Sequence, residues 1–205
     1  MYGIITGLLI FVLLGLTTHT EMVASIDRTF SLSMEAVRTP LLNKFIIGVT
    51  ELGSIVIMLP FLLLVLLVFL YKRKVIESIF LSAAFITVRL LNWILKGLYE
   101  RLRPSFHPLV HESTYSFPSG HAMNSTVFYS FLCFLIIKMS PLSETANRAI
   151  AVFTALFILL IGFTRIYLGV HYLTDVLAGF AVGTAWVLIL KKLFYKAYFY
   201  RNRQK

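Results

Sequence analysis

Six long apolar stretches run through this chain of 205 residues, separated by short polar segments. A transmembrane helix needs about 20 predominantly apolar residues, and a chain that is 59% hydrophobic has room for about six. Only 14% of the residues are charged, too few to cover a soluble domain. We therefore expect one all-α, polytopic membrane domain over residues 1–205, with six transmembrane helices in a bundle at residues 2–18, 52–71, 75–99, 119–138, 148–163 and 171–195.

A segment of different character follows the first apolar stretch. Ile26, Phe30, Met34 and Val37 recur at helical spacing, with charged residues between them. This pattern predicts an amphipathic helix that lies in the membrane interface after the first span. No Lys or Arg precedes the first apolar stretch to form the basic region of a signal peptide, so we favour a membrane span there.

The charge of the chain is strongly positive, with 19 Lys and Arg against 9 Asp and Glu and a net charge of +10. In a chain this apolar, we interpret the excess as a bias towards one membrane face and expect no nucleic-acid partner. Eleven basic residues fall on the side of both termini: Lys72, Arg73, Lys74, Lys138, Arg148, Lys191, Lys192, Lys196, Arg201, Arg203 and Lys205. Seven fall on the other side, so the positive-inside rule predicts cytoplasmic termini.

Three groups of polar residues stand at the span ends that face away from the termini. They are Lys96 and Arg103, then Ser119, Gly120 and His121, then Arg165, His171 and Asp175. Because neighbouring spans run in opposite directions, all three groups are expected to converge at the extracytoplasmic end of the bundle. Together they supply three cations, two histidines, one carboxylate and the start of a helix.

Each of these groups suits a phosphoryl substrate. Arginine side chains match the geometry of phosphate oxygens, and the helix that starts at Ser119 and Gly120 offers free N–H groups and a positive dipole end. His171 and Asp175 are four residues apart, so we expect them on one helical face at the start of the last span. A carboxylate that holds one imidazole nitrogen leaves the other free to attack phosphorus.

The order and spacing of these residues resemble a known family signature. The motifs are Lys96-x6-Arg103-Pro104, Pro118-Ser119-Gly120-His121 and Arg165-x5-His171-x3-Asp175. Together they resemble the three-part signature of the type 2 phosphatidic acid phosphatase, or lipid phosphate phosphatase, family. The match extends from Lys96 to Asp175, and the six-span layout carries it over most of the chain.

The resemblance implies a role for each motif residue. His171 attacks phosphorus and forms a phosphohistidine, Asp175 orients His171, and His121 protonates the leaving lipid oxygen. The implied phosphate-binding residues are Lys96, Arg103, Ser119, Gly120 and Arg165. One departure is Thr164, which stands where the family usually has serine, and we expect its hydroxyl to keep a hydrogen bond to phosphate.

Metal and cofactor chemistry are not expected. Two-metal sites need several clustered carboxylates, and the outer segments near the motifs offer only Glu100, Glu112 and Asp175. The sequence therefore predicts a metal-independent enzyme without a cofactor. Its expected partners are the lipid phosphate substrate and the membrane lipids, with no obligate protein partner.

Two substrates and two other protein classes remain as alternatives. The minimal chain suits a bacterial cell-membrane enzyme, for which we favour hydrolysis of phosphatidylglycerol phosphate to phosphatidylglycerol. Undecaprenyl diphosphate is close behind, and phosphatidic acid is also covered by the family. A lipid-phosphate transporter is less favoured because the key charges cluster at helix ends rather than at broken helices near the midplane. A haloperoxidase shares this anion site, but those enzymes are soluble.

The sequence leaves the role of some polar residues open. Arg89, Asn92 and Lys96 are spaced i, i+3 and i+7, so they are predicted to share one helix face. Arg89 could influence the site through Asn92 or pair with groups inside the bundle, and we favour the second role. His107 and His111 lack a third ligand nearby, so we expect solvation or headgroup contact rather than zinc binding. The single cysteine, Cys133, excludes a disulfide framework.

Overall fold

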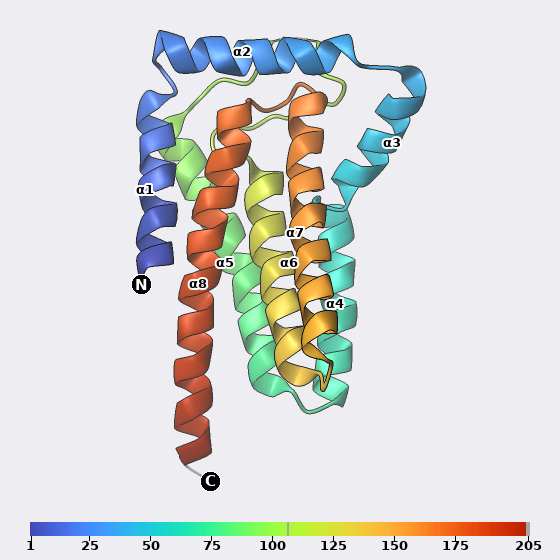
Figure 1. Ribbon diagram of the computed structural model, residues 1–205, viewed down its shortest axis with the longest axis vertical. Helices are drawn as coiled ribbons and strands as arrows, with labels where there is room; N and C mark the ends of the chain where they lie inside the picture. Colours follow the sequence, from blue (N-terminus) through green and yellow to red (C-terminus); the bar gives the residue numbers. More distant parts are fainter. Residues whose placement is uncertain (106, 204–205) are drawn as a thin grey trace.

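The computed structural model describes residues 1–105 and 107–203, which form eight α-helices and no β-strand (Figure 1). The helices are α1 (Tyr2–Thr17), α2 (Glu21–Ala36), α3 (Pro40–Glu51), α4 (Ile55–Tyr71), α5 (Val75–Tyr99), α6 (Gly120–Met139), α7 (Glu144–Tyr167) and α8 (Leu173–Arg203). Lys205, counted above with the basic residues on the side of the termini, lies outside the described residues. The predicted all-α fold is confirmed.

Four helices, α5 to α8, are each long and apolar enough to cross a membrane. Two bent pairs, α1 with α2 and α3 with α4, raise the number of candidate spans in the described residues to six if each pair counts as one span. The predicted six-span membrane bundle agrees with this upper number. Both ends of the chain lie on the side away from α2 (Figure 1).

The second span differs from its prediction at its N-terminal end. The chain is helical from Pro40 rather than from residue 52, because Thr39 caps α3 by accepting a hydrogen bond from the Leu42 N–H and proline fits the first helical position. A bend of 43° at residues 52–54 then separates α3 from α4. This break brings Gly53 and Ser54 to the wall of a cavity at that end of the bundle.

The interfacial helix is present as α2, which crosses the end of the bundle at 95° to α1 (Figure 1). Ile26 and Phe30 are exposed on α2, as expected for a face that contacts lipid, whereas Asp27 is completely buried against the bundle. The guanidinium of Arg38, just after α2, donates to the Tyr167 carbonyl at 2.8 and 3.0 Å. The segment after the interfacial helix is therefore held on the C-terminal end of α7 by polar contacts.

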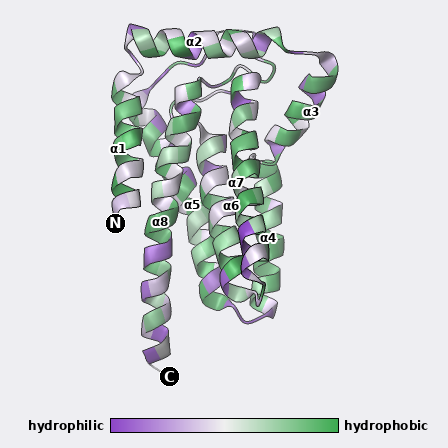
Figure 2. Ribbon diagram, viewed as in Figure 1, coloured by the Kyte–Doolittle hydropathy of each residue, from purple (hydrophilic) through white to green (hydrophobic). Residues whose placement is uncertain are grey.

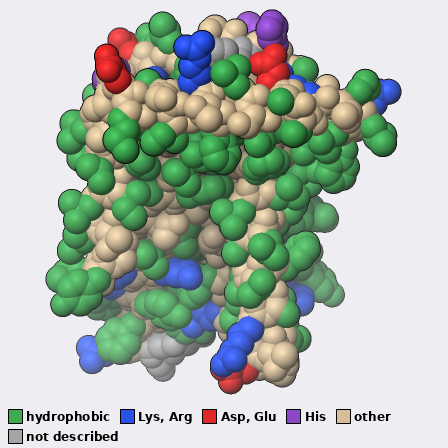
Figure 3. Space-filling model, turned by 45° about the horizontal axis from the view of Figure 1, so that its top comes forward, with side chains coloured by type: hydrophobic (Ala, Val, Ile, Leu, Met, Phe, Trp, Pro, Cys, Tyr) green, Lys and Arg blue, Asp and Glu red, His purple; other side chains and the backbone are tan. Residues whose placement is uncertain are grey.

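The surface follows the same division between membrane and water. Hydrophobic residues dominate the bodies of the helices, and hydrophilic residues gather on α2 and at the far end of α8 (Figure 2). Apolar side chains cover the sides of the bundle below α2, and charged side chains lie towards its two ends (Figure 3). This distribution agrees with an integral membrane protein.

Helix α6 is the most buried of the four long spans and packs against α5, α7 and α8. Small residues allow α8 to approach it closely. A Cβ added at Gly179 would lie 2.8 Å from the Ser119 carbonyl oxygen and 3.0 Å from the Ala122 Cβ. A Cβ at Gly183 would lie 2.9 Å from the Thr126 Cβ. Such glycine contacts are typical of close helix packing in membranes.

The replacement Gly179→Ala is expected to destabilise the protein, because its methyl group would meet backbone atoms of α6 that cannot move independently. Overpacking of this kind costs about 1–3 kcal/mol. Thermal unfolding of the detergent-purified protein measures the effect as a lower Tm.

Gly97→Ala is the matched control, since a Cβ at Gly97 meets no atom within 4 Å. Alanine is the better helix former, so the control should keep or slightly raise the Tm. Equal Tm values for the two variants would contradict the packing argument.

Candidate active site

A cavity of about 250 Å³ lies at the end of the bundle that α2 crosses. Five of the eight residues predicted from the sequence line it: Lys96, Arg103, Gly120, His121 and His171. The other three, Ser119, Arg165 and Asp175, are buried. Each of these three adjoins or contacts a residue of the cavity wall, so the structure brings the three sequence motifs together.

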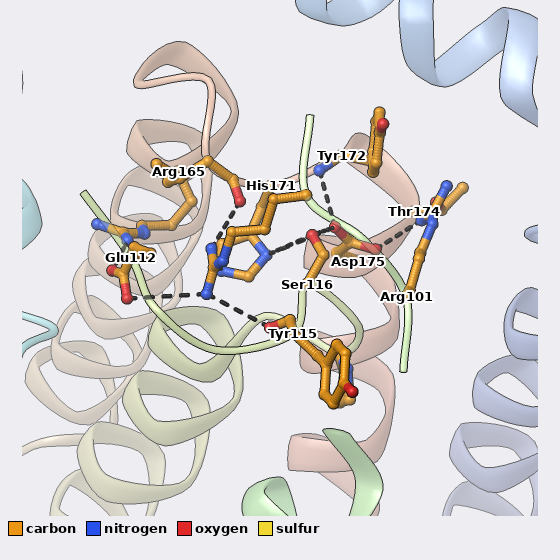
Figure 4. A network of polar contacts seen from close by, with 12 residues as sticks. Arg101, Glu112, Tyr115, Ser116, Arg165, His171, Tyr172, Thr174 and Asp175 are labelled. Atoms are coloured by element: carbon orange, nitrogen blue, oxygen red, sulfur yellow. Dashed lines mark hydrogen bonds and ion pairs between the residues drawn. The ribbon is translucent and has the colours of Figure 1, made fainter. Parts of the chain in front are cut away.

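His171 lies in the loop before α8 rather than on the helix itself, so the expectation of one shared helical face with Asp175 is wrong. The two side chains still meet. The Nδ1 atom of His171 is 3.4 Å from Oδ2 of Asp175, and both side chains are buried. The Ser116 hydroxyl lies beside this pair, 3.3 Å from Nδ1, and donates to Oδ2 of Asp175 at 2.5 Å (Figure 4).

The Asp175 carboxylate accepts two further hydrogen bonds. Arg101 donates to Oδ1 at 2.6 Å, and the backbone N–H of Tyr172 donates to Oδ2 at 2.8 Å (Figure 4). The backbone carbonyl of Asp175 accepts from the N–H of Ser119 at 3.0 Å, which joins the starts of α8 and α6. Asp175 is therefore fixed from several sides, and through it so is Nδ1 of His171.

The interfacial helix contributes to this network through Asp27. Its carboxylate accepts from Arg101 at 2.8 Å, from the Thr174 N–H at 3.0 Å and from the Thr174 hydroxyl at 2.6 Å. Arg101 thus bridges two buried carboxylates, Asp27 and Asp175, and also lies over the Tyr172 ring at 4.3 Å. Sequence analysis missed Asp27, Arg101 and Ser116, because their partners are distant in the chain and no local spacing indicates them.

Arg103, in the loop that follows α5, contacts the loop before α8 that carries His171. Its Nη1 is 3.2 Å from Nε2 of His171 and donates to the Val170 carbonyl at 2.7 Å. Its Nε donates to the Thr114 carbonyl at 2.7 Å. Lys96 donates from Nζ to the Tyr115 carbonyl. Both cations are therefore held by backbone carbonyls and present positive charge at the cavity wall.

Arg165 lies behind this wall and is almost completely buried. It forms an ion pair with Glu112 and donates to the Thr50 hydroxyl at 2.8 Å, while its Nε is buried without a partner. The preceding residue, Thr164, is fully buried, and its hydroxyl donates to the Ile161 carbonyl at 2.6 Å. The expected hydrogen bond from Thr164 to phosphate is therefore wrong, because the hydroxyl is occupied within its own helix.

The start of α6 is open towards the cavity. Ser119 is the N-cap residue, its hydroxyl makes no capping bond, and its Oγ is buried without a partner. A Cβ at Gly120 would lie 3.0 Å from Oδ1 of Asn92, so glycine permits the close approach of α5. The free N–H groups and the dipole of α6 make this helix end a site for an anion.

Arg89 and Asn92 also line the cavity, together with Lys96. The predicted common face of these three residues on α5 is confirmed. Sequence reasoning favoured a role for Arg89 inside the bundle and did not place it in the site, although the same spacing contains the signal.

The electrostatics of the cavity favour a neutral His171. Burial lowers the pKa of His171 well below its usual value, and the positive charge of Arg103 lowers this pKa further. A neutral imidazole with Nδ1 held at Asp175 keeps the lone pair on Nε2, the atom that lies next to Arg103 and the cavity. This arrangement can deliver a nitrogen nucleophile to a bound anion.

Comparison with known proteins agrees with the fold. Residues 75–199 match the PAP2 superfamily. Phosphatidylglycerophosphatase B of Bacillus subtilis is 36% identical over 191 residues, 93% of this chain and 94% of that protein. A lipid A 4'-phosphatase of Porphyromonas gingivalis is 29% identical, over 88% of this chain and 76% of that protein.

A solved structure extends the likeness to the fold. The crystal structure of a transmembrane PAP2-type phosphatidylglycerolphosphate phosphatase from Bacillus subtilis has a TM-score of 0.92 at 36% identity, covering 96% of this chain and 98% of that one. The chain belongs to the PAP2 superfamily, as its three motifs indicated. The predicted class, an integral membrane phosphatase, is confirmed.

The lowered pKa of His171 predicts that this residue stays neutral at pH 6.5, where an unperturbed histidine is half protonated. NMR titration of protein with ¹³C-labelled histidine checks this, with a His171→Gln variant to assign the signal. In Arg103→Gln the titration midpoint should rise, because removing a positive charge makes protonation easier.

Arg148→Gln serves as the control, since Arg148 is exposed and its ion pair with Glu144 lies at the start of α7, at the opposite end of that helix from the site. This variant should leave the midpoint of His171 unchanged. A wild-type midpoint at or above pH 6.5 would be incompatible with the proposed electrostatics.

Proposed function

We propose that this protein hydrolyses the terminal phosphate of phosphatidylglycerol phosphate and releases phosphatidylglycerol. The observation that carries the proposal is the buried His171–Asp175 pair, whose imidazole Nε2 lies beside a cavity lined by Lys96, Arg103 and His121. The substrate assignment is supported by the likeness to the Bacillus subtilis phosphatidylglycerophosphatase B over nearly the whole chain.

In the first step, Nε2 of His171 attacks the phosphorus atom of the terminal phosphate. A P–N bond forms while the P–O bond to the lipid breaks, and His121 donates a proton to the leaving oxygen. Asp175 stabilises the positive charge that develops on the His171 ring. General acid catalysis by a residue such as His121 contributes about 10²–10⁴ in rate.

In the second step, water hydrolyses the phosphohistidine. His121, now neutral, removes a proton from the water, whose oxygen forms the new P–O bond as the P–N bond breaks. Inorganic phosphate leaves, and His171 and His121 return to their starting protonation states. The same pair of histidines therefore serves both halves of the reaction.

The remaining motif residues stabilise the charge on phosphorus. Arg103 is fixed next to the nucleophile, so a phosphate oxygen bound by its guanidinium lies close to Nε2 of His171. Lys96 and the N-terminus of α6 at Ser119 and Gly120 supply further positive charge, and Arg165 supplies it from behind the wall. Fixed donors and charges of this kind give the largest contribution to many enzymes. Metal independence stays a prediction.

We also propose that the site faces the extracytoplasmic side and that the termini are cytoplasmic. The support is the excess of basic residues at the end of the bundle away from α2, including the turn at Lys72, Arg73 and Lys74.

The activity is tested by measuring phosphate release from phosphatidylglycerol phosphate in detergent micelles. Wild-type protein should release phosphate, His171→Ala should release none, and His121→Ala should be slower by about 10²–10⁴-fold. After rapid quenching with ³²P-labelled substrate, acid-labile label should be found on the wild-type protein and be absent from His171→Ala.

His19→Ala, a change at an exposed histidine between α1 and α2, is the matched control and should keep full activity. Undecaprenyl diphosphate and phosphatidic acid are measured alongside to rank the substrates. Full activity in His171→Ala would rule out the proposed mechanism, and no release from any of the lipids would rule out the function.

The orientation is tested by cysteine labelling, because the single native cysteine, Cys133, is buried and can be replaced by serine. In intact cells, a membrane-impermeant maleimide should label Ser113→Cys, in the exposed loop near the site, and should label Arg73→Cys only after the cells are opened. The reverse pattern would place the site on the cytoplasmic face.

A further inference from the structure

Arg89 is a cation of the cavity wall that none of the three motifs contains. It lies on α5 seven residues before Lys96, which places its Cα about 10 Å deeper along the helix axis. Both residues line the same cavity, with Asn92 between them on the same face. The cavity therefore has cations at two depths: Lys96 and Arg103 near the outer end, and Arg89 further into the membrane.

Arg89 is also the cation of this wall whose charge is least compensated. Its guanidinium lies over the Phe85 ring at 4.4 Å, its Nη2 is 4.0 Å from the Met58 sulfur, and its Nε is buried without a partner. Within the described residues, no carboxylate forms an ion pair with it. Since an unpaired charge at this depth is costly, such residues usually mark a binding site or ion pathway.

Two other residues of the cavity wall also have a buried polar atom that lacks a hydrogen-bond partner. Ser54, at the break between α3 and α4, and Asn124, on α6, line the cavity, and each has a buried polar atom without a hydrogen-bond partner. Buried polar atoms are normally paired, so exceptions need an explanation such as a ligand. Here the exceptions line the same cavity as Arg89, where they can bind a polar group of the substrate.

Arg89 belongs to the side of the cavity that receives the leaving group. In-line attack by His171 places the leaving oxygen on the far side of phosphorus, where His121 donates its proton. His171 is held by Arg103, Ser116 and Asp175, and within the described residues Arg89 forms no hydrogen bond or ion pair with it, although Arg89 and His121 line the same cavity. A group carried by the leaving lipid therefore lies on the same side as Arg89.

We propose that Arg89 binds a second phosphate, carried by the leaving group, and so selects lipids with two phosphates over phosphatidic acid. This inference rests on the proposed function and adds a specificity-determining residue to it. In phosphatidylglycerol phosphate, a glycerol unit separates the terminal phosphate from a phosphodiester that lies deeper, next to the diacylglycerol. This order matches the two depths of cations in the cavity.

The cavity also offers hydrogen-bond partners for the glycerol unit and for the phosphodiester of the substrate. The free hydroxyl of the glycerol unit can donate to Oδ1 of Asn124, and the Ser54 hydroxyl can donate to a phosphodiester oxygen. Phosphatidic acid has no second phosphate on its leaving diacylglycerol, so it leaves Arg89 unpaired. Discrimination therefore arises from a buried charge that only one class of substrate neutralises.

The test is the ratio of kcat/KM for phosphatidylglycerol phosphate to that for phosphatidic acid, in the same micelles. Arg89→Gln should lower this ratio about 10–100-fold, the effect of losing a charge-assisted hydrogen bond to phosphate, while phosphatidic acid hydrolysis stays nearly constant. Arg89→Lys keeps the charge and should recover part of the ratio. Arg148→Gln, a change at an exposed arginine at the start of α7, should not alter the ratio.

Two additional measurements make the outcome decisive. An isoprenoid diphosphate also carries its second phosphate on the leaving group: a loss there too assigns Arg89 to second phosphates in general, and a loss for phosphatidylglycerol phosphate alone assigns it to the glycerol-spaced one. Binding of both phospholipids to His171→Ala, with and without Arg89→Gln, reports selectivity without turnover.

The inference and the proposed function fail in different ways. An unchanged ratio in Arg89→Gln, or an equal loss for both substrates in a variant with wild-type Tm, would overturn the role of Arg89 and leave the phosphatase assignment intact. Absence of phosphate release by the wild-type protein would overturn the proposed function, and the binding measurement would still decide whether Arg89 selects the second phosphate.

Discussion

The buried carboxylate of Asp175 joins most of the segments that form the site. It accepts hydrogen bonds from Ser116 and Arg101 in the loop after α5 and from the Tyr172 N–H before α8. Its backbone carbonyl accepts from Ser119 at the start of α6. A carboxylate without exposure needs such partners, because an uncompensated buried charge is strongly destabilising. The contacts that hold the Asp175 carboxylate are therefore also the contacts that assemble the site.

Charge compensation explains why α2 belongs to the site although it lies across the bundle. Arg101 contacts Asp175, and its second carboxylate partner is Asp27 of α2. Glu112 plays the corresponding part for Arg165 and lies 3.7 Å from Arg103. In a low-dielectric surrounding each of these pairings is much stronger than in water, so an apolar bundle can hold this many charges only as a connected network. The interfacial helix is thereby linked through Arg101 to the His171–Asp175 pair.

The sequence predicted the parts of the site that depend on short spacing. The shared face of Arg89, Asn92 and Lys96 follows from the helical repeat alone, and the PAP2 family is confirmed by comparison. The expected spans lie close to α1, α4, α5 and α6, whereas α7 extends about four residues further at each end and α8 ends at Arg203 rather than at residue 195. Helix α3 was not expected, because the segment after Pro40 carries too few consecutive apolar residues to be read as a span.

Contacts between distant segments could not be predicted in this way. The pairing of Arg101 with Asp27 joins residues 74 positions apart, and that of Thr174 with Asp27 joins residues 147 apart. Only tertiary packing decides such partners. It also decides that His171 reaches Asp175 from a loop rather than from a helix, and that the Thr164 hydroxyl bonds within α7. Composition and periodicity define the bundle, whereas the polar network depends on how its ends fold over one another.

In one half of the site the buried polar atoms have hydrogen-bond partners, and in the other half several of them have none. This division has a functional reason. At the His171–Asp175 pair, both carboxylate oxygens and both ring nitrogens have partners. On the anion side, atoms of Ser119 and Arg165 are buried without any. Unpaired buried donors lower the stability of the protein, and the proposed phosphate would pair them. Because the donors are already in place, they need little reorganisation as charge develops on the phosphate, which is the condition for electrostatic catalysis.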